Sequence, residues 1–300
     1  MACCSKSVLK SLLEAIERDE IFPAYRFYRV NNEFCLLGTG KHSIVYEMHS
    51  KKEDKAHCAL KIVFVDQSKM TEQDYITALK LQKRLGNINQ NILRVLDIKI
   101  VNFSDINNGS EGGVAYLILL EKLECMLVHR DKGKDQLVLK ENEVIHLGIQ
   151  MCEALMELHR CHYLHRDIKL ENIYVDRQCR CFKLGDFDYA VREREARKEI
   201  GICTKGYSPP EIIKVNDTYT IASEIYALGI CLYLLLNDYK FPASESYRVN
   251  KVQYSSYFTF PAPIRASAQL ARLLRKMCSY DKKDRYQSIN EVQAALKKLI

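Results

Sequence analysis

The segment YLHRDIKLENIYV, residues 163–175, decides how the rest of the chain is interpreted. Five side chains with chemical potential lie within eight of its residues: His165, Arg166, Asp167, Lys169 and Asn172. A carboxylate such as Asp167 can accept a proton from a hydroxyl, an ammonium such as Lys169 can steady a phosphoryl group, and an amide such as Asn172 can ligate a metal ion. A solvated loop would rarely place these types in this order beside an apolar strand, so the segment predicts a catalytic loop.

A second segment, KLGDFDYAV at residues 183–191, supplies a further carboxylate. Asp186 lies fourteen residues after Asn172. Mg²⁺ prefers hard oxygen ligands, so we expect Asp186 to be the main ligand of that ion. Phe187 should pack inward and hold the aspartate in place.

Two weaker signals lie in the first third of the chain. GTGKHSIV, residues 38–45, carries glycines that would let backbone N–H groups cradle a phosphate, although an ordinary glycine-bearing hairpin also fits. CALKIV, residues 58–63, places Lys61 in an apolar strand, where an unpaired charge is costly. A phosphate would balance that charge; the alternative is an edge-strand lysine that points to water.

The order of the expected elements predicts an α+β fold with two lobes and a cleft between them. Strand-like runs dominate residues 25–123, with one helix at residues 71–85. Later helices are expected at residues 142–165, 221–237, 267–278 and 288–300. We therefore expect an N-terminal extension at residues 1–20, a β-rich N-lobe at residues 21–123 and an α-helical C-lobe at residues 124–300. The extension carries a short amphipathic helix that could dock on the first lobe or bind a partner.

Composition argues against several classes of protein. The 300 residues are 47% hydrophobic, enough for a sizeable core. No apolar run approaches the ~20 residues of a membrane-spanning helix, and charges interrupt the N-terminus where a secretory signal would be apolar. The net charge of +7 comes from basic residues interspersed with acidic ones, which argues against a nucleic-acid partner.

The twelve cysteines form no CxxC pair, and most stand singly in apolar runs, as small buried hydrophobes do. Cys179 and Cys181 are two residues apart, which is poor spacing for a metal site. Cys3 and Cys4 are open to acylation, but a disordered terminus is favoured because no second anchor is evident. We expect a reduced, cytoplasmic monomer, with the nucleus left open.

Together the four segments resemble the motifs of eukaryotic-type protein kinases, in that family's order and over nearly the whole chain. SPPE, residues 208–211, resembles the motif that closes the activation segment, and DKKDR, residues 281–285, would supply the arginine that pairs with its glutamate. EIYALG, residues 224–229, resembles a motif of a buried helix in which the family has Asp at position 224. The resemblance implies structural roles for Arg166, Glu211, Glu224 and Arg285.

The resemblance also implies ATP and Mg²⁺ as cofactors and a protein as substrate. Lys61 would contact the α- and β-phosphates, and Asp167 would orient the acceptor hydroxyl, with Lys169 beside it. Asn172 and Asp186 would hold Mg²⁺. The adenine and its flanks would involve Leu37, Gly38, Gly40, Val45, Ala59, Glu121 and Leu123, with Leu120 as gatekeeper. Catalysis would consist mostly of positioning and charge neutralisation.

Two features are similar to the Ser/Thr branch of that family. The first is Lys169, which favours Ser/Thr over Tyr specificity because the loop is not of the Ala-Ala-Arg type. The second is Thr204, seven residues before Glu211, which would bond to the catalytic aspartate and lysine. One alternative is a pseudokinase that serves as a nucleotide-binding scaffold or interaction module; another is a phosphotransferase for small molecules. Thr204 and the Pro-Pro-Glu closure favour protein substrates, and the joint presence of the full polar set favours catalysis.

The largest departure from the family lies in the helix of the first lobe. The family has there a glutamate that pairs with the strand lysine, and this position falls at Ala78, or at Thr77 with a shift of one residue. Neither can form an ion pair. Asp74 lies one turn earlier and would need a slide of ~5.4 Å to reach Lys61. The alternative is that Lys61 has no acidic partner, with Gln82 offering a neutral hydrogen bond.

The activation segment, residues 186–211, departs from the family in two further ways. Asp188 replaces a glycine that often has positive φ, and we expect it to be tolerated because Asp is one of the few other residues that adopt this conformation. The segment has no Thr or Ser outside its closing region. One of Glu193, Glu195 and Glu199 would replace a phosphate by pairing with Arg166, unless this strip is simply solvated.

Overall fold

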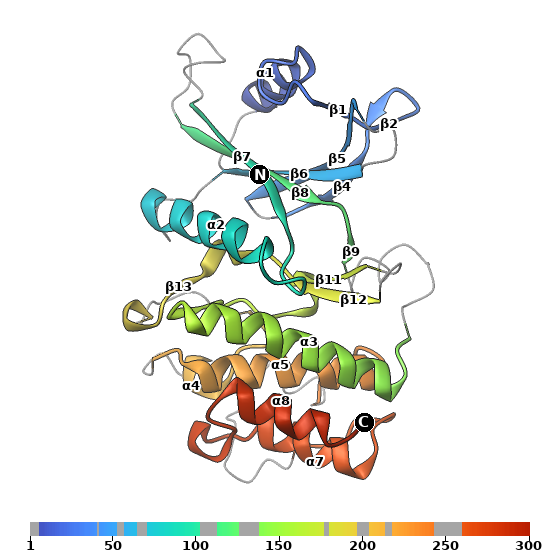
Figure 1. The fold of residues 1–300 in the computed structure, drawn as a ribbon, viewed down its shortest axis with the longest axis vertical. Coiled ribbons are helices and arrows are strands. Elements are labelled where there is room, and N and C mark those ends of the chain that lie inside the picture. The colour runs from blue at the N-terminus through green and yellow to red at the C-terminus, as the bar shows by residue number, and fades with distance from the viewer. Residues whose placement is uncertain are drawn as a thin grey trace. The chain divides into compact units, whose positions relative to one another are not determined.

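The computed structural model describes residues 6–40, 42–52, 57–64, 71–102, 113–125, 138–176, 180–196, 204–213, 218–242 and 260–300. Two compact units make up the chain, and Figure 1 draws both. The first unit comprises residues 1–87 and 93–122, and the second comprises residues 88–92 and 123–300.

An antiparallel sheet forms the framework of the first unit, with the strand order β1-β5-β6-β8-β7 and β4 paired to β5. Its strands are β1 (Tyr25–Phe27), β4 (Leu36–Thr39), β5 (Ser43–Ser50), β6 (His57–Phe64), β7 (Val95–Asn102) and β8 (Val114–Glu121). A separate short pair joins β2 (Arg29–Val30) and β3 (Glu33–Phe34). The strand-rich character expected of this part of the chain is confirmed.

The two faces of this sheet are covered by different helices, which lie on opposite sides of it in Figure 1. Helix α1 (Lys6–Glu17) buries Val8, Leu12 and Ile16 in one apolar cluster with alternate residues of β6 and β8, such as Leu60 and Leu117. On the other face, α2 (Glu72–Gly86) places the ring of Tyr75 edge-on to Tyr116 of β8, with 4.8 Å between centroids. The structure thus docks the N-terminal helix on the first unit.

The second unit is mainly helical, with α3 (Glu141–Arg160), α4 (Pro210–Ile213), α5 (Ile221–Leu236), α7 (Ala268–Met277) and α8 (Ile289–Lys297). Every residue of α5 after Ile221 is buried, as its apolar sequence predicts. An alanine methyl group at Gly229 would lie 2.6 Å from Sγ of Cys278, so only glycine lets α5 approach the end of α7 this closely.

Small β-elements of the second unit carry the polar segments between these helices. Strands β9 (Glu124–Cys125), β11 (Ile173–Asp176) and β12 (Cys181–Leu184) form one antiparallel sheet, and β10 (Tyr163–Leu164) pairs with β13 (Val191–Arg192). The helix expected at residues 142–165 ends earlier, at Arg160. His162 adopts a φ of 59°, a left-handed conformation that no α-helix continues, and the chain turns into β10.

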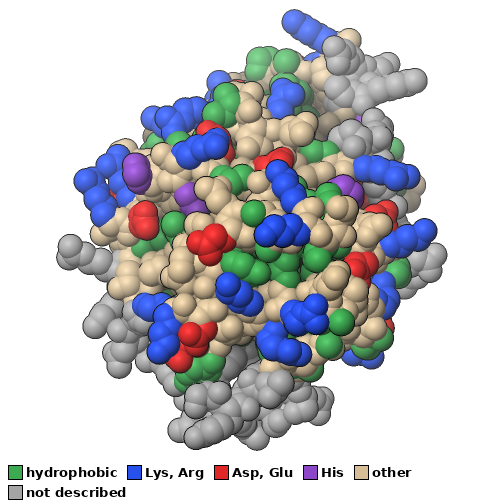
Figure 2. Space-filling view, turned by 60° about the horizontal axis from the view of Figure 1, so that its bottom comes forward, with side chains coloured by type: hydrophobic (Ala, Val, Ile, Leu, Met, Phe, Trp, Pro, Cys, Tyr) green, Lys and Arg blue, Asp and Glu red, His purple; other side chains and the backbone are tan. Residues whose placement is uncertain are grey.

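The surface agrees with the mixed charge of the sequence. On the face drawn in Figure 2, Lys and Arg side chains are interspersed with acidic and apolar ones and form no continuous stripe. No helix within the described ranges is long and apolar enough to cross a membrane. The seven cysteines in those ranges that can be assessed are free thiols.

Candidate active site

The carboxylate of Asp167 is the centre of a hydrogen-bonded cluster in the second unit. The loop between β10 and the 3₁₀ turn η2 (Leu170–Asn172) presents this side chain, which is 4% exposed as a residue. Oδ1 accepts a hydrogen bond from Thr204 Oγ1 at 2.7 Å. Oδ2 accepts from Lys169 Nζ at 2.6 Å and from Asn172 Nδ2 at 3.0 Å. Both oxygens are therefore held, and the carboxylate has a fixed orientation.

Lys169 remains an ammonium in this cluster. Burial alone would lower its pKa, but the carboxylates of Asp167 and Asp186 outweigh burial and raise the pKa above its ordinary value. Asn172 uses its amide nitrogen twice, for the carboxylate of Asp167 and for that residue's carbonyl at 2.8 Å. Its amide oxygen is thus the atom left to reach a cation.

Buried groups beneath the loop hold its backbone. Glu224 of α5 is fully buried, and its Oε1 accepts hydrogen bonds from the amides of His165 and Arg166. Its Oε2 lies 2.6 Å from Nε2 of His159 on α3. The longer glutamate, where the family has Asp, therefore still reaches the loop. No motif in the sequence marks His159, which sequence reasoning missed.

The His165 ring lies under the loop and is completely buried. Nε2 lies 3.1 Å from the carbonyl of Gly185, and the ring stands edge-on to Phe187 with 4.9 Å between centroids. Burial lowers the pKa of His165, and the opposing effect of nearby carboxylates such as Glu224 does not restore it. The ring is therefore neutral near pH 7 and links the catalytic loop to the segment that carries Asp186.

The backbone at Asp186 is strained, with φ of 62° and ψ of 66° in the left-handed region. Phe187 packs inward with no exposure, as expected. Asp188 lies within the 3₁₀ turn η3 (Phe187–Tyr189) and is not among the described residues with positive φ. The reason expected for its tolerance is therefore wrong: the left-handed residue here is Asp186, and position 188 needs no glycine-like conformation.

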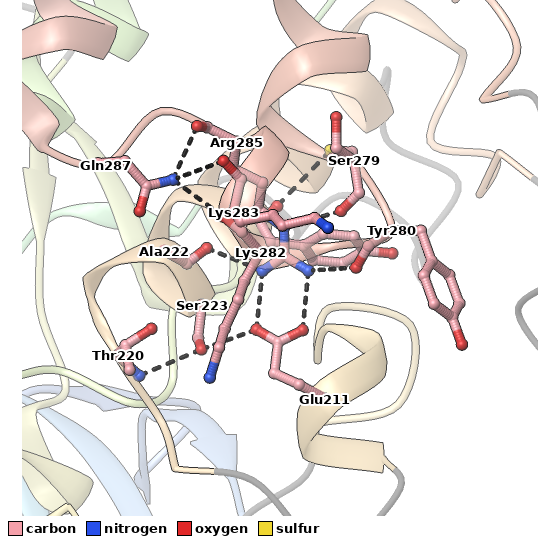
Figure 3. A network of polar contacts seen from close by, with 12 residues as sticks. Glu211, Thr220, Ala222, Ser223, Ser279, Tyr280, Lys282, Lys283, Arg285 and Gln287 are labelled. Atoms are coloured by element: carbon pink, nitrogen blue, oxygen red, sulfur yellow. Dashed lines mark hydrogen bonds and ion pairs between the residues drawn. The ribbon is translucent and has the colours of Figure 1, made fainter. Parts of the chain in front are cut away.

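A buried ion pair closes the segment that begins at Asp186 (Figure 3). The Arg285 guanidinium donates to both carboxylate oxygens of Glu211, at 2.7 and 2.8 Å. Its other hydrogen bonds go to the carbonyls of Ser279, Ala222 and Tyr280. All the N–H donors of a guanidinium are thereby used, and Arg285 is 2% exposed. This is the pair that the sequence predicts.

The first unit holds most of the residues expected to bind nucleotide. In the antiparallel register Val45 of β5 lies opposite Lys61 of β6, and Glu47 lies opposite Ala59, so these four side chains share one face of the sheet. That face is the one opposite α1, and Lys61 is 9% exposed on it. Leu120, opposite Ala59 on β8, is 8% exposed.

The glycine segment is described on both sides of residue 41, which lies outside the described residues. Leu37 and Gly38 lie on β4, and the amide of Gly40 donates to the carbonyl of Ser43 at 2.7 Å. A Cβ at Gly40 would lie 2.7 Å from the Ser43 hydroxyl, a side-chain end that can rotate away, so space alone does not require glycine there. At the other end of the sheet, Glu121 is the last residue of β8, and Leu123 belongs to the second unit.

Polar side chains of helix α2 form hydrogen bonds within the helix or with the nearby residue Leu93. The Thr71 hydroxyl caps the helix: it accepts from the amide of Asp74 at 3.2 Å and donates to the Asp74 carboxylate at 2.6 Å. Thr77 donates to the carbonyl of Gln73, and Gln82 donates to the carbonyl of Leu93. Within the described ranges, Asp74 is exposed and its carboxylate is committed to the helix N-terminus.

The acidic strip of the activation segment is on the surface. Glu195 pairs with the neighbouring Arg194 at 3.2 Å, and both side chains are largely exposed. Glu193 is also exposed, and Glu199 lies outside the described residues. A solvated strip is the simpler description of the two glutamates that the structure describes.

Comparison with known proteins places this geometry in a family. The family model described as protein kinase domain matches residues 32–297. The chain belongs to the protein kinase domain family. A solved structure, that of the granulovirus kinase PK-1 of Cydia pomonella granulovirus, resembles this kinase domain with a TM-score of 0.68. It covers 95% of this chain and 97% of that one at 19% identity, and so supports the protein kinase fold.

Curated relatives of this kinase domain include serine/threonine kinases. The putative serine/threonine-protein kinase A of Trypanosoma brucei brucei is 28% identical over 272 residues, 86% of this chain and 58% of that protein. The Aurora kinase of Debaryomyces hansenii is 32% identical over 209 residues, or 67% and 46% of the two chains. MAP kinase-activated protein kinase mak-1 of Caenorhabditis elegans is 32% identical over 160 residues, or 52% and 29%. The kinase domain thus spans 29% to 58% of the length of these three relatives.

Proposed function

We propose that the chain transfers the γ-phosphoryl group of ATP to Ser or Thr hydroxyls of protein substrates, with Mg²⁺. The observation that carries the proposal is the Asp167 carboxylate, oriented by Thr204, Lys169 and Asn172. Fold stability alone does not demand such a buried polar cluster, because each desolvated group must be compensated. A carboxylate held in one orientation is what alignment of an attacking hydroxyl requires.

The donor set fits Mg²⁺ delivered with a nucleotide. Asn172 and Asp186 offer an amide oxygen and a carboxylate, and Mg²⁺ in such enzymes takes one or two protein oxygens with the rest from phosphates and water. No group of three or more His, Cys, Asp and Glu side chains suited to a metal occurs in the described part of the chain. When bound, the ion would neutralise charge on the phosphates.

The chain's own residues would then do the following. Asp167 orients the acceptor hydroxyl and receives its proton, and the Lys169 ammonium balances charge on the transferred group. Thr204 keeps Asp167 Oδ1 in place. In the first unit, Lys61 would hold the α- and β-phosphates. The proposed adenine site consists of Leu37, Gly38, Gly40, Val45, Ala59, Glu121 and Leu123. The preference for Ser and Thr is supported by the bond from Thr204 to Asp167 and by the similarity to the putative serine/threonine-protein kinase A of Trypanosoma brucei brucei.

The test is transfer of ³²P from [γ-³²P]ATP to a generic basic protein by the purified chain. Removing the proton acceptor in the isosteric variant Asp167→Asn should reduce transfer by about 10³-fold. Asp238→Asn is a matched control on the exposed surface of the second unit, where Asp238 pairs with Arg265 at 3.3 Å, and should leave transfer unchanged. Equal transfer by wild type and Asp167→Asn would refute the proposal.

A nucleotide-binding scaffold is the second candidate, and one observation favours it. The position where the family has a glutamate in this helix is Ala78, which is fully buried in α2. The carboxylate of Asp74 accepts a hydrogen bond from Thr71. A scaffold would show no transfer in the assay above. A rise in melting temperature with Mg-ATP, without transfer, would then establish it, because a ligand that binds the folded state stabilises it.

A further inference from the structure

Glu47 is a buried carboxylate that no kinase motif in this chain includes. The residue is 4% exposed in the middle of β5, and Oε1 lies 2.5 Å from Nζ of Lys122 and 2.6 Å from Nδ1 of His57. Its Oε2 accepts a weak hydrogen bond from Sγ of Cys35 at 3.5 Å. Three side chains, each from a different part of the first unit, therefore meet on one carboxylate.

This ion pair differs from the others described in the first unit. The remaining pairs join side chains that are 33% to 78% exposed, such as Lys83 with Asp97 at 3.4 Å. Exposed pairs of that kind contribute little, because water screens them. The side chain of Glu47 is only 6% exposed, so its partners must compensate for the loss of water. Burial would raise the pKa of Glu47, but Lys122 and His57 outweigh it and lower the pKa, so the carboxylate is charged at neutral pH.

Lys122 lies directly after the end of β8, so its ion pair affects the backbone that follows this strand. The ladder between β6 and β8 ends with the pair Cys58 and Glu121, so Lys122 is the first residue beyond the sheet. In the strand order β5-β6-β8, its side chain must pass the end of β6 to reach Glu47 on β5. His57 is the first residue of β6 and contacts the same carboxylate oxygen. The ion pair thus ties Lys122 to the sheet, one residue beyond the last backbone pairing of β8.

We propose that Glu47 is a positioning residue that fixes Lys122, and with it the backbone at residues 121–123, for binding the adenine of ATP. This inference rests on the proposed function, which places adenine against Glu121 and Leu123. Two observations support it. Glu47 lies directly opposite Ala59 and two residues from Val45, on the face proposed to cover the adenine. The amide and carboxylate of Glu121 are themselves engaged with the backbone of Arg94, so Lys122 is the next link to be held.

The test combines two variants with one control. Glu47→Gln keeps the shape and removes the charge, and Lys122→Met removes the other partner from a more exposed position. Asp97→Asn, which disrupts the exposed pairs of Asp97 with Lys83 and Lys99 in the same unit, is the control. The KM for ATP should rise about tenfold in both variants with kcat within about twofold, and the double variant should resemble the single ones because contacting groups are not additive.

A second measurement separates this inference from the proposed function. Amide hydrogen exchange of the nucleotide-free chain should be faster over residues 119–123 in Glu47→Gln and in Lys122→Met than in wild type or Asp97→Asn. Faster exchange in a chain that neither binds nor uses ATP would support the fixation of Lys122 and refute the proposed function. Unchanged exchange in both variants would overturn the fixation. Faster exchange with an unchanged KM for ATP would overturn the assignment to nucleotide binding.

Discussion

The catalytic loop of the second unit and helix α2 of the first unit use their polar side chains in opposite ways. In the loop, the residues that the sequence singles out contact one another: Thr204, Lys169 and Asn172 all meet on Asp167. In α2, the side chains considered as partners for Lys61 are engaged with the nearest turn or with Leu93. The loop gathers its polar groups on one carboxylate, whereas those of α2 are divided between the helix's own first turns and neighbouring segments such as Leu93 and β7.

The difference has a physical origin. A loop of eight residues brings its side chains together through short turns. Buried Glu224 holds its backbone from beneath, and the loop's own His165 ring contacts the carbonyl of Gly185. An ion pair between a helix and a strand depends on how the helix packs against the sheet, which many apolar contacts decide together. Local motifs therefore fix the geometry of the second unit's site far more firmly than that of the first.

The largest expected effect on stability comes from removing the ion pair between Glu211 and Arg285 at the end of the activation segment. Arg285→Met removes the partner of Glu211 and leaves a carboxylate, 9% exposed in its side chain, without its ion pair. The free energy of unfolding should fall by about 3–5 kcal/mol, because an uncompensated buried charge remains. Urea unfolding monitored by circular dichroism measures the loss. The exposed Arg272→Met on α7 is the control and should change the free energy by less than about 0.5 kcal/mol. A loss below about 1 kcal/mol for Arg285→Met would show that the buried network does not support the second unit.

A smaller effect sharpens the comparison through pH. The folded-state pKa of His165 is lowered by burial, so the unfolded chain takes up the proton first as the pH falls below about 6.5. The contribution of His165 to the free energy of unfolding should therefore be constant above pH 6.5. Below pH 6.5 it should decrease by up to about 1.4 kcal/mol per pH unit. His165→Phe should lose that part of the slope between pH 6.5 and 5.5, measured by urea unfolding at each pH.

The control for this experiment is His146→Gln, an exposed position on α3. His165→Phe also removes the contact with the Gly185 carbonyl, so its stability at pH 7.5 should be lower by about 1 kcal/mol. The slope, not the absolute value, reports the buried neutral ring. An identical slope in wild type and His165→Phe would contradict the assignment.

Much of the second unit could be predicted because its signals are local or strongly apolar. The buried character of α5 follows from its uninterrupted apolar run, and the pairing of Glu211 with Arg285 follows from motif resemblance. The left-handed conformation expected at Asp188 is found at Asp186 instead, because residue type alone does not say which of these two aspartates adopts it.

The contacts of Glu47 could not be predicted from the sequence. Lys122 is separated from it by 75 residues and lies in no motif. The pair exists because the register of β5, β6 and β8 brings the middle of β5 close to the residue that follows β8. Register is set by the whole apolar pattern of a sheet and not by any single residue. Sequence reasoning placed Lys61 in an apolar strand but did not find the polar group buried on the same face of the sheet.

The smallest expected effect tests the other side of the comparison, the helix α2. Asp74→Asn should lower the free energy of unfolding by only about 0.3–1 kcal/mol, because it removes a negative charge from the first turn of the helix. Phosphotransfer should stay within about twofold of wild type, since the Asp74 carboxylate serves Thr71. Thr71→Ala is the matched variant: it removes the cap, should cost about 1 kcal/mol, and should spare activity equally. If Asp74→Asn abolished transfer while Thr71→Ala did not, Asp74 would be acting on Lys61 in the working enzyme. Helix α2 would then have to slide by about one turn, ~5.4 Å, during catalysis.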